Sequence, residues 1–142
     1  MAVRSAFARW EGSLPEGSGT MRLAGGAFEG PYSAQSRFEE GAGTNPEELI
    51  AAAHAGCFSM ALTAALGRAG FSPQSVETVA KVQLLKRDEG FRITRIDLEA
   101  TASVPGIEVA KFQEIAEGAK AGCPVSVALG GVPEIALDAR LA

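Results

Sequence analysis

Residues that can do redox or metal chemistry are scarce in this chain. Its 142 residues include two cysteines, Cys57 and Cys123, and one histidine, His54. Two cysteines and one histidine leave no good fourth ligand for zinc, so we expect no metal site. A chain of this length can bury a core without structural disulfides. Any special chemistry therefore depends on two thiols that lie 66 residues apart in the sequence.

Several other features are absent. The chain has no run of like charges, and its net charge of −4 argues against nucleic acid or an anionic membrane as a partner. Its first ten residues lack the apolar segment of a secretory signal. The longest apolar stretch, residues 49–66, is interrupted by His54, Gly56 and Ser59, which suits a buried helix better than a membrane span. We expect a cytoplasmic protein in which a lasting structural disulfide does not form.

The order of elements predicts a single α+β domain over residues 1–142. The expected elements are strands within 1–38 (one of them at 36–38), a central helix at about 46–69, a β-hairpin at 75–104, a second helix at 107–121, a short helix at 124–129 and a final strand at 134–141. The hydrophobic alternation changes phase between Ile93 and Ile96, which indicates a β-bulge in the hairpin.

The central helix has the strongest signals. Asn45 is a good N-cap, Pro46 fits the first helical position, and Glu48 stands three residues after the cap. Gly70 is expected to stop the helix. Because its sequence is apolar almost all round, we expect little of it to touch water. In a domain this small, that burial suggests a partner subunit.

Both cysteines lie in segments that could activate a thiol. A free cysteine is only about 3% thiolate at pH 7, and the thiolate is the nucleophile. Cys123 stands where an N-cap belongs, just before Pro124, so backbone donors could act on its sulfur. Arg37 is a permanent cation that would favour a thiolate, and Glu47 could hold its guanidinium in a bidentate grip.

Each of these residues also has a plainer interpretation. The two cysteines could be inert core residues, and Arg37 could be a solvated residue with weak surface pairs. Glu47 could be an ordinary first-turn carboxylate. His54 lies three residues before Cys57 and could tune the thiol, but packing with both ring nitrogens satisfied is the favoured interpretation.

Longer segments carry a resemblance to a known family. Residues 44–62 and 119–126, which surround the two cysteines, resemble the two cysteine motifs of the OsmC/Ohr family (osmotically inducible protein C and organic hydroperoxide resistance). Residues 132–139 are also similar, as are the short segments 10–12 and 70–71. His54 in place of a tyrosine, and Arg37 before the helix, are closer to the OsmC branch. Gly56, where the family often has alanine, is a small departure.

The resemblance implies a cysteine peroxidase that reduces organic hydroperoxides, and hydrogen peroxide more weakly, in oxidative or osmotic stress. It implies that Cys57 is the peroxidatic thiol, Cys123 the resolving thiol, and Arg37 with Glu47 the activating pair. It also implies two antiparallel-rich sheets wrapped around central helices in an intertwined homodimer, with sites at the subunit interface. No cofactor is expected, and the reductant would be an external dithiol, with lipoylated proteins as a candidate.

Helix geometry adds a constraint on this site. Ten residues separate Glu47 from Cys57, which is about 15 Å along a helix axis, so one arginine can hardly serve both. Either the helix is interrupted, or Arg37 and Glu47 act on the cysteine of the other subunit, which we favour. An apolar substrate pocket lined by Phe58 and Met60 is a further expectation. A non-catalytic carrier of apolar ligands, or a redox sensor, is the alternative function.

Overall fold

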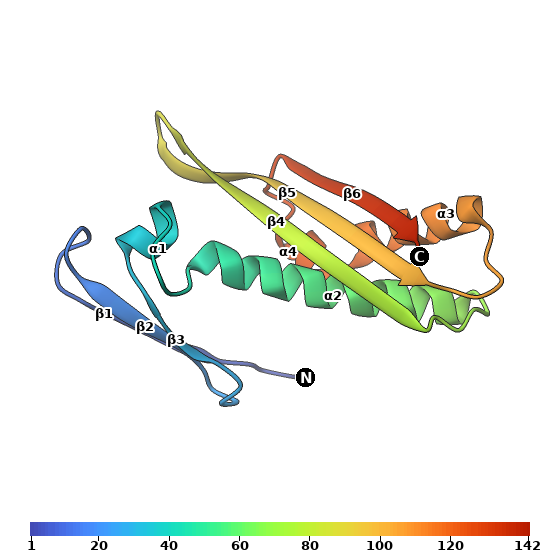
Figure 1. Ribbon diagram of the computed structural model, residues 1–142, viewed down its shortest axis with the longest axis horizontal. Helices are drawn as coiled ribbons and strands as arrows, with labels where there is room; N and C mark the ends of the chain where they lie inside the picture. Colours follow the sequence, from blue (N-terminus) through green and yellow to red (C-terminus); the bar gives the residue numbers. More distant parts are fainter. The chain divides into compact units, whose positions relative to one another are not determined.

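Two groups of strands and helices follow one another along the chain, and a computed structural model describes both, residues 1–142 (Figure 1). The chain divides into unit 1, Met1–Leu49, and unit 2, Ile50–Ala142. The elements in order are β1 (Ala6–Glu11), β2 (Ser18–Leu23), β3 (Glu29–Tyr32), α1 (Ala34–Phe38), α2 (Pro46–Arg68), β4 (Ser75–Arg87), β5 (Gly90–Ser103), α3 (Val109–Gly122), α4 (Pro124–Ala128) and β6 (Glu134–Leu141). The fold class is α+β, as predicted.

Unit 1 contains a three-stranded antiparallel sheet in the order β1-β2-β3. Trp10 on β1 packs edge to face on Tyr32 of β3, with ring centroids 5.3 Å apart. None of the buried hydrophobic residues of the chain belongs to this unit. A three-stranded sheet without a buried apolar face is only marginally stable in water. Unit 1 therefore needs another protein surface packed against its sheet to be stable.

The prediction of a strand at residues 36–38 is wrong, because these residues end the short helix α1. Ser33 and Ser36 form a capping box: the Ser33 hydroxyl accepts from the Ser36 N–H at 3.1 Å, and the Ser36 hydroxyl accepts from the Ser33 N–H at 2.8 Å. These reciprocal bonds satisfy donors that a helix start leaves unpaired. The local capping chemistry outweighs the short apolar alternation that suggested a strand.

Helix α2 begins as its sequence predicts. The Asn45 side chain accepts from the N–H of Glu48 at 2.8 Å, and the Thr44 hydroxyl donates to the Glu48 carboxylate at 2.7 Å. At the other end Gly70 has a positive φ of 90°, a conformation that favours glycine and ends the helix. The helix runs without interruption from Pro46 to Arg68.

Unit 2 is built on a second three-stranded sheet in the order β4-β5-β6. Strands β4 and β5 form the antiparallel hairpin, whereas β6 pairs in parallel with β5. Parallel pairing needs a long crossover, which α3 and α4 supply. The pairing register shifts so that Thr94 has no partner between Ile93 and Arg95. The expected bulge is therefore present in β5.

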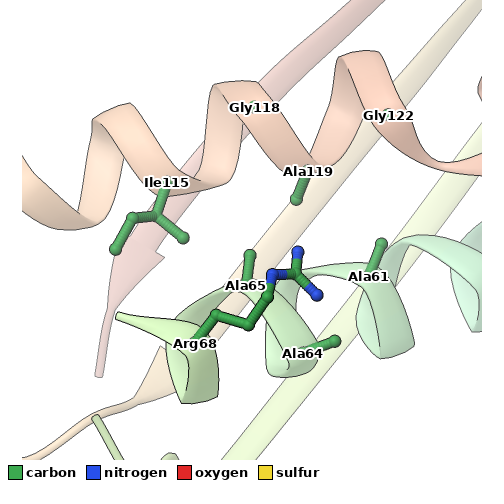
Figure 2. A pocket seen from close by; sticks show the side chains of 8 residues that line it. All are labelled: Ala61, Ala64, Ala65, Arg68, Ile115, Gly118, Ala119 and Gly122. Atoms are coloured by element: carbon green, nitrogen blue, oxygen red, sulfur yellow. The ribbon is translucent and has the colours of Figure 1, made fainter. Parts of the chain in front are cut away.

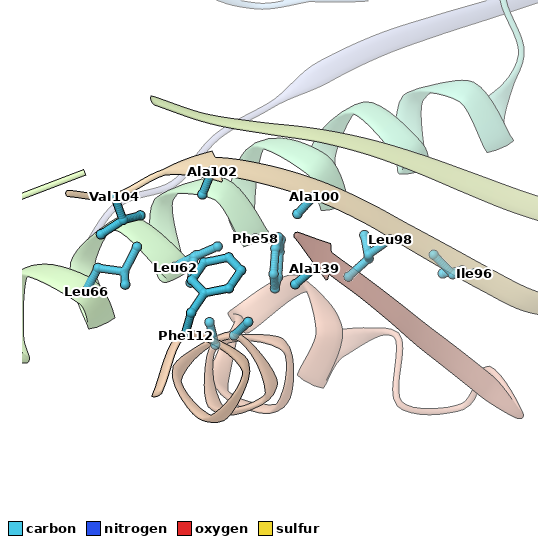
Figure 3. Close-up of a cluster of buried hydrophobic side chains, with 12 residues drawn as sticks. Phe58, Leu62, Leu66, Ile96, Leu98, Ala100, Ala102, Val104, Phe112 and Ala139 are labelled. Atoms are coloured by element: carbon cyan, nitrogen blue, oxygen red, sulfur yellow. The ribbon is translucent and has the colours of Figure 1, made fainter. Parts of the chain in front are cut away.

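The core of unit 2 lies between this sheet and the helices α2 and α3 (Figure 3). Helix α2 contributes Phe58, Leu62 and Leu66, which recur at helical spacing, and all three are fully buried. The facing side chains come from alternate positions of β5 and from α3: Ile96, Leu98, Ala100, Ala102, Phe112, Ala116 and Ala119. These residues fix α2 against the sheet and so determine where Cys57 lies.

Unit 2 leaves the opposite face of α2 uncovered. Ala53, Gly56, Met60 and Ala64 are exposed along it, and Met60 keeps 76% of its surface accessible. The expected burial of the whole helix would therefore need the partner subunit that the sequence suggests, and it stays a prediction. By length and composition α2 could also cross a membrane, yet its other face forms part of the core, as in the central helices of many globular proteins.

Candidate functional site

The two cysteine sulfurs lie next to each other in unit 2. Cys57 is on the middle turns of α2, and Cys123 stands between α3 and α4. Their Sγ atoms are 2.8 Å apart, and both thiols are free. A disulfide bond is about 2.05 Å long, so a small side-chain movement would join them. The fold thus brings together two thiols that are distant in the sequence.

The local sequence explains where Cys123 is placed. Helix α3 ends at Gly122, and Pro124 begins α4 because proline lacks the N–H that a first turn leaves unpaired. Cys123 is the N-cap residue of α4, as predicted. Its sulfur makes no capping hydrogen bond of normal geometry, but the nearby N–H groups of Val125 and Ser126 act to lower the pKa of its thiol.

The two thiols differ in exposure and acidity. Cys123 is fully buried, whereas Cys57 is partly exposed. Burial alone would raise the pKa of Cys123, but hydrogen bonds from the Cys57 thiol, from the Ser126 side chain and from the N–H groups of α4 together lower that pKa. Burial and the neighbouring Cys123 raise the pKa of Cys57. These surroundings therefore favour a thiolate on Cys123 over one on Cys57.

The direction of the hydrogen bond between the sulfurs depends on which thiol is ionised. In the neutral pair the Cys123 thiol donates to Cys57. Once Cys123 has lost its proton, the Cys57 thiol donates to the Cys123 thiolate. The resemblance implies that Cys57 is the peroxidatic thiol, and a positive charge near its sulfur would favour the thiolate there.

Arg37 and Glu47 form a tight ion pair in unit 1. The Arg37 Nη2 is 2.7 Å from Glu47 Oε1, and its Nε lies 3.3 Å and 3.2 Å from the two carboxylate oxygens. The Glu47 side chain is 10% exposed and that of Arg37 is 37% exposed. The grip is bidentate, as the sequence analysis expected, and it fixes the direction of the guanidinium.

His54 lies one turn before Cys57 on α2 and is completely buried. Its Nε2 is 2.7 Å from the hydroxyl of Ser126, while its Nδ1 has no hydrogen-bond partner. The favoured interpretation, in which both ring nitrogens are satisfied, is therefore wrong for Nδ1. The sequence analysis also did not single out Ser126, because only the fold brings α4 against the middle of α2.

A groove of about 500 Å³ lies between α2 and α3 (Figure 2). Ile115 lies at one end, and the guanidinium of Arg68 reaches into the middle, between Ala65 and Ala61 (Figure 2). The remaining lining residues are small: Ala61, Ala64, Ala65, Gly118, Ala119 and Gly122. Ala61 lies one turn beyond Cys57, and Gly122 directly precedes Cys123. The groove therefore reaches sequence neighbours of both cysteines, although neither cysteine lines it.

The expected pocket residues do not line this groove. Phe58 is fully buried in the core, and Met60 points from the exposed face of α2. Phe58 and Met60 are two positions apart on α2 and so face different sides of the helix. Their role in a substrate pocket stays a prediction. As for metals, no three His, Cys, Asp or Glu side chains form a cluster that could hold an ion.

Comparisons with known proteins agree with this geometry and with the resemblance in the sequence. The chain is 52% identical over 135 residues to peroxiredoxin OsmC of Escherichia coli, covering 94% of this chain and 93% of that protein. It is 34% identical over 98 residues to an organic hydroperoxide resistance protein of Xanthomonas axonopodis, covering 68% and 67% of the two chains.

The fold has close counterparts among solved structures. The crystal structure of an organic hydroperoxide resistance protein OsmC from Legionella pneumophila superimposes with a TM-score of 0.73 over 100% of this chain and 99% of that one, at 23% identity. The model of the family described as OsmC-like protein matches residues 39–138, a range that includes both cysteines. The protein therefore belongs to the OsmC-like family.

Proposed function

We propose that this protein is a thiol-dependent peroxidase that reduces organic hydroperoxides, and hydrogen peroxide more weakly, in defence against peroxide stress. The observation that carries the proposal is the 2.8 Å separation of two free sulfurs in a chain of this family. Relatives named for peroxiredoxin activity and for organic hydroperoxide resistance support it. Two adjacent thiols can store and release the two electrons that peroxide reduction requires.

The proposed cycle has three steps. The Cys57 thiolate attacks the distal peroxide oxygen, the O–O bond breaks, and Cys57 becomes a sulfenic acid while the alcohol leaves with a proton. Cys123 then attacks the Cys57 sulfur, which forms a disulfide and releases water. An external dithiol, for which lipoylated proteins are candidates, reduces the disulfide by exchange. The partial exposure of Cys57 supports its role as attacker, because Cys123 is out of reach of a peroxide in solution.

Arg37 is the proposed source of the positive charge that Cys57 needs. The Glu47 grip directs the guanidinium, which would stabilise both the thiolate and the charge developing on the leaving oxygen. Because α2 is continuous, Glu47 lies about 15 Å along the helix axis from Cys57. We therefore propose that the Arg37–Glu47 pair of one subunit serves Cys57 of the other subunit in a homodimer.

Two features of the protomer support a homodimer. The exposed face of α2 carries small apolar residues and Met60, and unit 1 has no buried apolar side chain of its own. Burial of apolar surface is the main stabilising contribution to a fold, and a second copy would supply it to both regions. Mixed dimers test the shared site: subunits carrying Cys57→Ser combined with subunits carrying Arg37→Ala should recover activity, and no recovery would contradict sharing.

The reaction itself is tested by peroxide consumption with dithiothreitol, beside a free-thiol count after one equivalent of peroxide. We expect turnover and the loss of two thiols per chain, and we expect Cys57→Ser to reduce turnover to background. Full peroxide consumption by Cys57→Ser would overturn the assignment. The alternative of an apolar-ligand carrier would be supported instead by ligand binding without loss of thiols.

The groove between α2 and α3 favours apolar peroxides. Its lining is mostly alanine and glycine, with Arg68 as the one charged residue, and it includes Gly122, the residue before Cys123. Desolvating an alkyl chain against such a surface adds binding energy that hydrogen peroxide cannot gain. We expect cumene hydroperoxide to react with a higher kcat/KM than hydrogen peroxide, and equal values would contradict the preference.

A further inference from the structure

Helix α4, which follows Cys123, has almost no apolar anchor of its own. It spans the five residues Pro124–Ala128, and Ser126 is its one buried residue. Val127 keeps 66% of its surface exposed, and Val125 is only partly buried. A helix this short is not stable alone and depends on the contacts of its buried side. The contact that Ser126 makes is therefore a main determinant of where α4 lies.

The buried contact of Ser126 is with the middle of α2. The Ser126 hydroxyl lies 2.7 Å from the Nε2 of His54, although the two residues are 72 positions apart in the sequence. His54 has no exposed surface, and Ser126 is 7% exposed. Losing one partner of a buried hydrogen bond is costly, because the group left behind stays unpaired. The bond between His54 and Ser126 therefore fixes α4 to α2.

The histidine ring is the donor in this bond. A neutral imidazole carries one N–H donor and one acceptor nitrogen. Buried N–H groups are rarely left without a partner, whereas acceptors are left so more often. The Nδ1 of His54 is buried and has no hydrogen-bond partner, so it is the unprotonated nitrogen. The Nε2–H group therefore donates to the Ser126 hydroxyl.

This bond and the cysteine pair are two successive contacts between the same two segments. His54 is three residues before Cys57, and Ser126 is three residues after Cys123. Each of the two contacts is thus about one helical turn from the other. The sulfurs meet at 2.8 Å, and the histidine and serine meet at 2.7 Å. The second contact fixes the two backbones beside the sulfurs.

We propose that His54 and Ser126 are positioning residues for the disulfide between Cys57 and Cys123. Their hydrogen bond holds the first turn of α4 against α2, so the two sulfurs stay close enough to join by side-chain movement alone. This inference rests on the proposed peroxidase cycle and assigns a role within its second step. Reacting atoms held close together behave as if they were at a very high concentration, which speeds the step and favours the closed disulfide.

The step balances without a further reactant. The Cys123 sulfur gives up its proton and forms an S–S bond with the Cys57 sulfur, while the S–O bond of the Cys57 sulfenic acid breaks. The hydroxide that leaves combines with that proton to form water. The Cys123 sulfur is oxidised and the Cys57 sulfur is reduced. His54 and Ser126 transfer neither a proton nor an electron and only hold the geometry.

The equilibrium between dithiol and disulfide tests this positioning without any peroxide. The protein is equilibrated with mixtures of reduced and oxidised dithiothreitol, and alkylation with mass spectrometry measures the fraction that carries the Cys57–Cys123 disulfide. We expect Ser126→Ala and His54→Phe each to lower the equilibrium constant for disulfide formation about tenfold, the effect of losing one buried hydrogen bond. The double variant should lose no more than either single variant, because both changes remove the same bond.

Conservative variants and a matched control separate positioning from general stability. Ser126→Thr keeps the hydroxyl, and His54→Gln supplies an amide N–H near the position of Nε2, so these variants should recover the equilibrium constant. Ser59→Ala removes a different bond of α2, the 2.8 Å contact between the Ser59 and Thr78 hydroxyls, and should leave the constant unchanged. His54→Phe gives the same test if Ser126→Ala does not fold. An unchanged constant in these two variants, an equal decrease in Ser59→Ala, or recovery in neither conservative variant would overturn the inference.

Single-turnover trapping separates this inference from the proposed function. Ser126→Ala should form the sulfenic acid at the normal rate but convert it to the disulfide about tenfold more slowly, so a dimedone-type reagent traps more of it. Equal trapping in the wild type and Ser126→Ala would refute the positioning role alone. Failure of the wild type to form any sulfenic acid would refute the peroxidase itself, and the dithiothreitol equilibrium would then decide the positioning independently.

Discussion

At the scale of residues, burial and hydrogen bonding change the pKa values of the two thiols in opposite directions. Cys123 is fully enclosed, yet hydrogen bonds lower its pKa in spite of that enclosure. Cys57 is more accessible, but its pKa is raised within the protomer. The more acidic thiol and the more reachable thiol are thus different residues. A cation close to the Cys57 sulfur would make Cys57 the more acidic thiol. The geometry of Arg37 is therefore the first point to test.

Arg37→Lys keeps the charge but removes the bidentate contact with Glu47. A lysine ammonium cannot make the paired bonds that Nε and Nη2 form here, so its direction is not fixed. We expect kcat/KM for cumene hydroperoxide to fall about tenfold, the effect of losing an oriented charge-assisted hydrogen bond. Arg9→Lys, in an exposed pair with Glu11, is the control and should be neutral. Full activity in Arg37→Lys would show that orientation is unimportant.

His54 predicts a pH dependence of stability. Its pKa is lowered in the folded protein by burial, whereas in the unfolded chain it should be near 6.5. The unfolded state therefore binds more protons in this range, and the contribution of His54 is complete above about pH 6.5 and lost as the pH falls toward the folded pKa. We expect the urea midpoint to decrease between pH 7.5 and pH 5.5.

Because His54 is the only histidine, one variant isolates its contribution. His54→Phe should flatten the stability profile over this range. The carboxyl groups with lowered pKa, Asp97 and Asp138, titrate at lower pH and do not interfere. A decrease of the same size in His54→Phe would assign the effect to other groups.

At the scale of elements, α2 carries residues of the candidate site and residues of the core. One end carries Glu47, the middle carries His54 and Cys57, and the buried side supplies Phe58, Leu62 and Leu66 to the core. A substitution at the first turn of α2 should therefore change the stability of the whole fold. The Asn45 side chain both caps the helix at Glu48 and donates to the Ser36 carbonyl at 2.9 Å.

Asn45→Ala removes both of these hydrogen bonds. We expect the free energy of unfolding to decrease by about 1 kcal/mol, the usual cost of losing an N-cap. Asn45→Asp keeps the capping acceptor but not the donor to Ser36, so it should lose less. Denaturant titration of the three proteins measures the difference. Equal stability of Asn45→Ala and the wild type would mean that the cap contributes nothing here.

At the scale of the whole molecule, apolar surface is left uncovered in a single chain. Unit 2 leaves one face of α2 exposed, and unit 1 has no buried apolar side chain of its own. The proposed homodimer gives one explanation for both features. Subunit association and activity should then change together.

Met60→Lys tests that link. A lysine in the middle of the exposed α2 face would place a charge inside the proposed interface, where its desolvation is costly. We expect the dimer to dissociate to monomer in light scattering and peroxide turnover to fall with it. Val109→Lys changes an equally apolar exposed residue at the start of α3 and should affect neither measurement. A wild-type protein that is monomeric and fully active would contradict the homodimer.

Sequence reasoning was most successful where the controlling interactions are local. The cap at Asn45, the stop at Gly70 and the N-cap position of Cys123 all follow from chemistry within one helical turn. It failed at residues 36–38, where a serine capping box overrides a weak pattern. It also did not distinguish the buried Phe58 from the exposed Met60, because a helix that is apolar all round does not reveal which face meets the core.

The sequence by itself determined α2, α3, α4, the hairpin with its bulge and the two candidate thiols, because each depends on neighbouring residues and on short periodic patterns. Only the tertiary structure decided that the sulfurs lie 2.8 Å apart, and that His54 meets Ser126. These contacts join residues more than sixty positions apart, and packing of the helices on the sheet brings them together. The relative acidity of the two thiols was decided at the same level, since burial and hydrogen bonding exist only once the chain has folded.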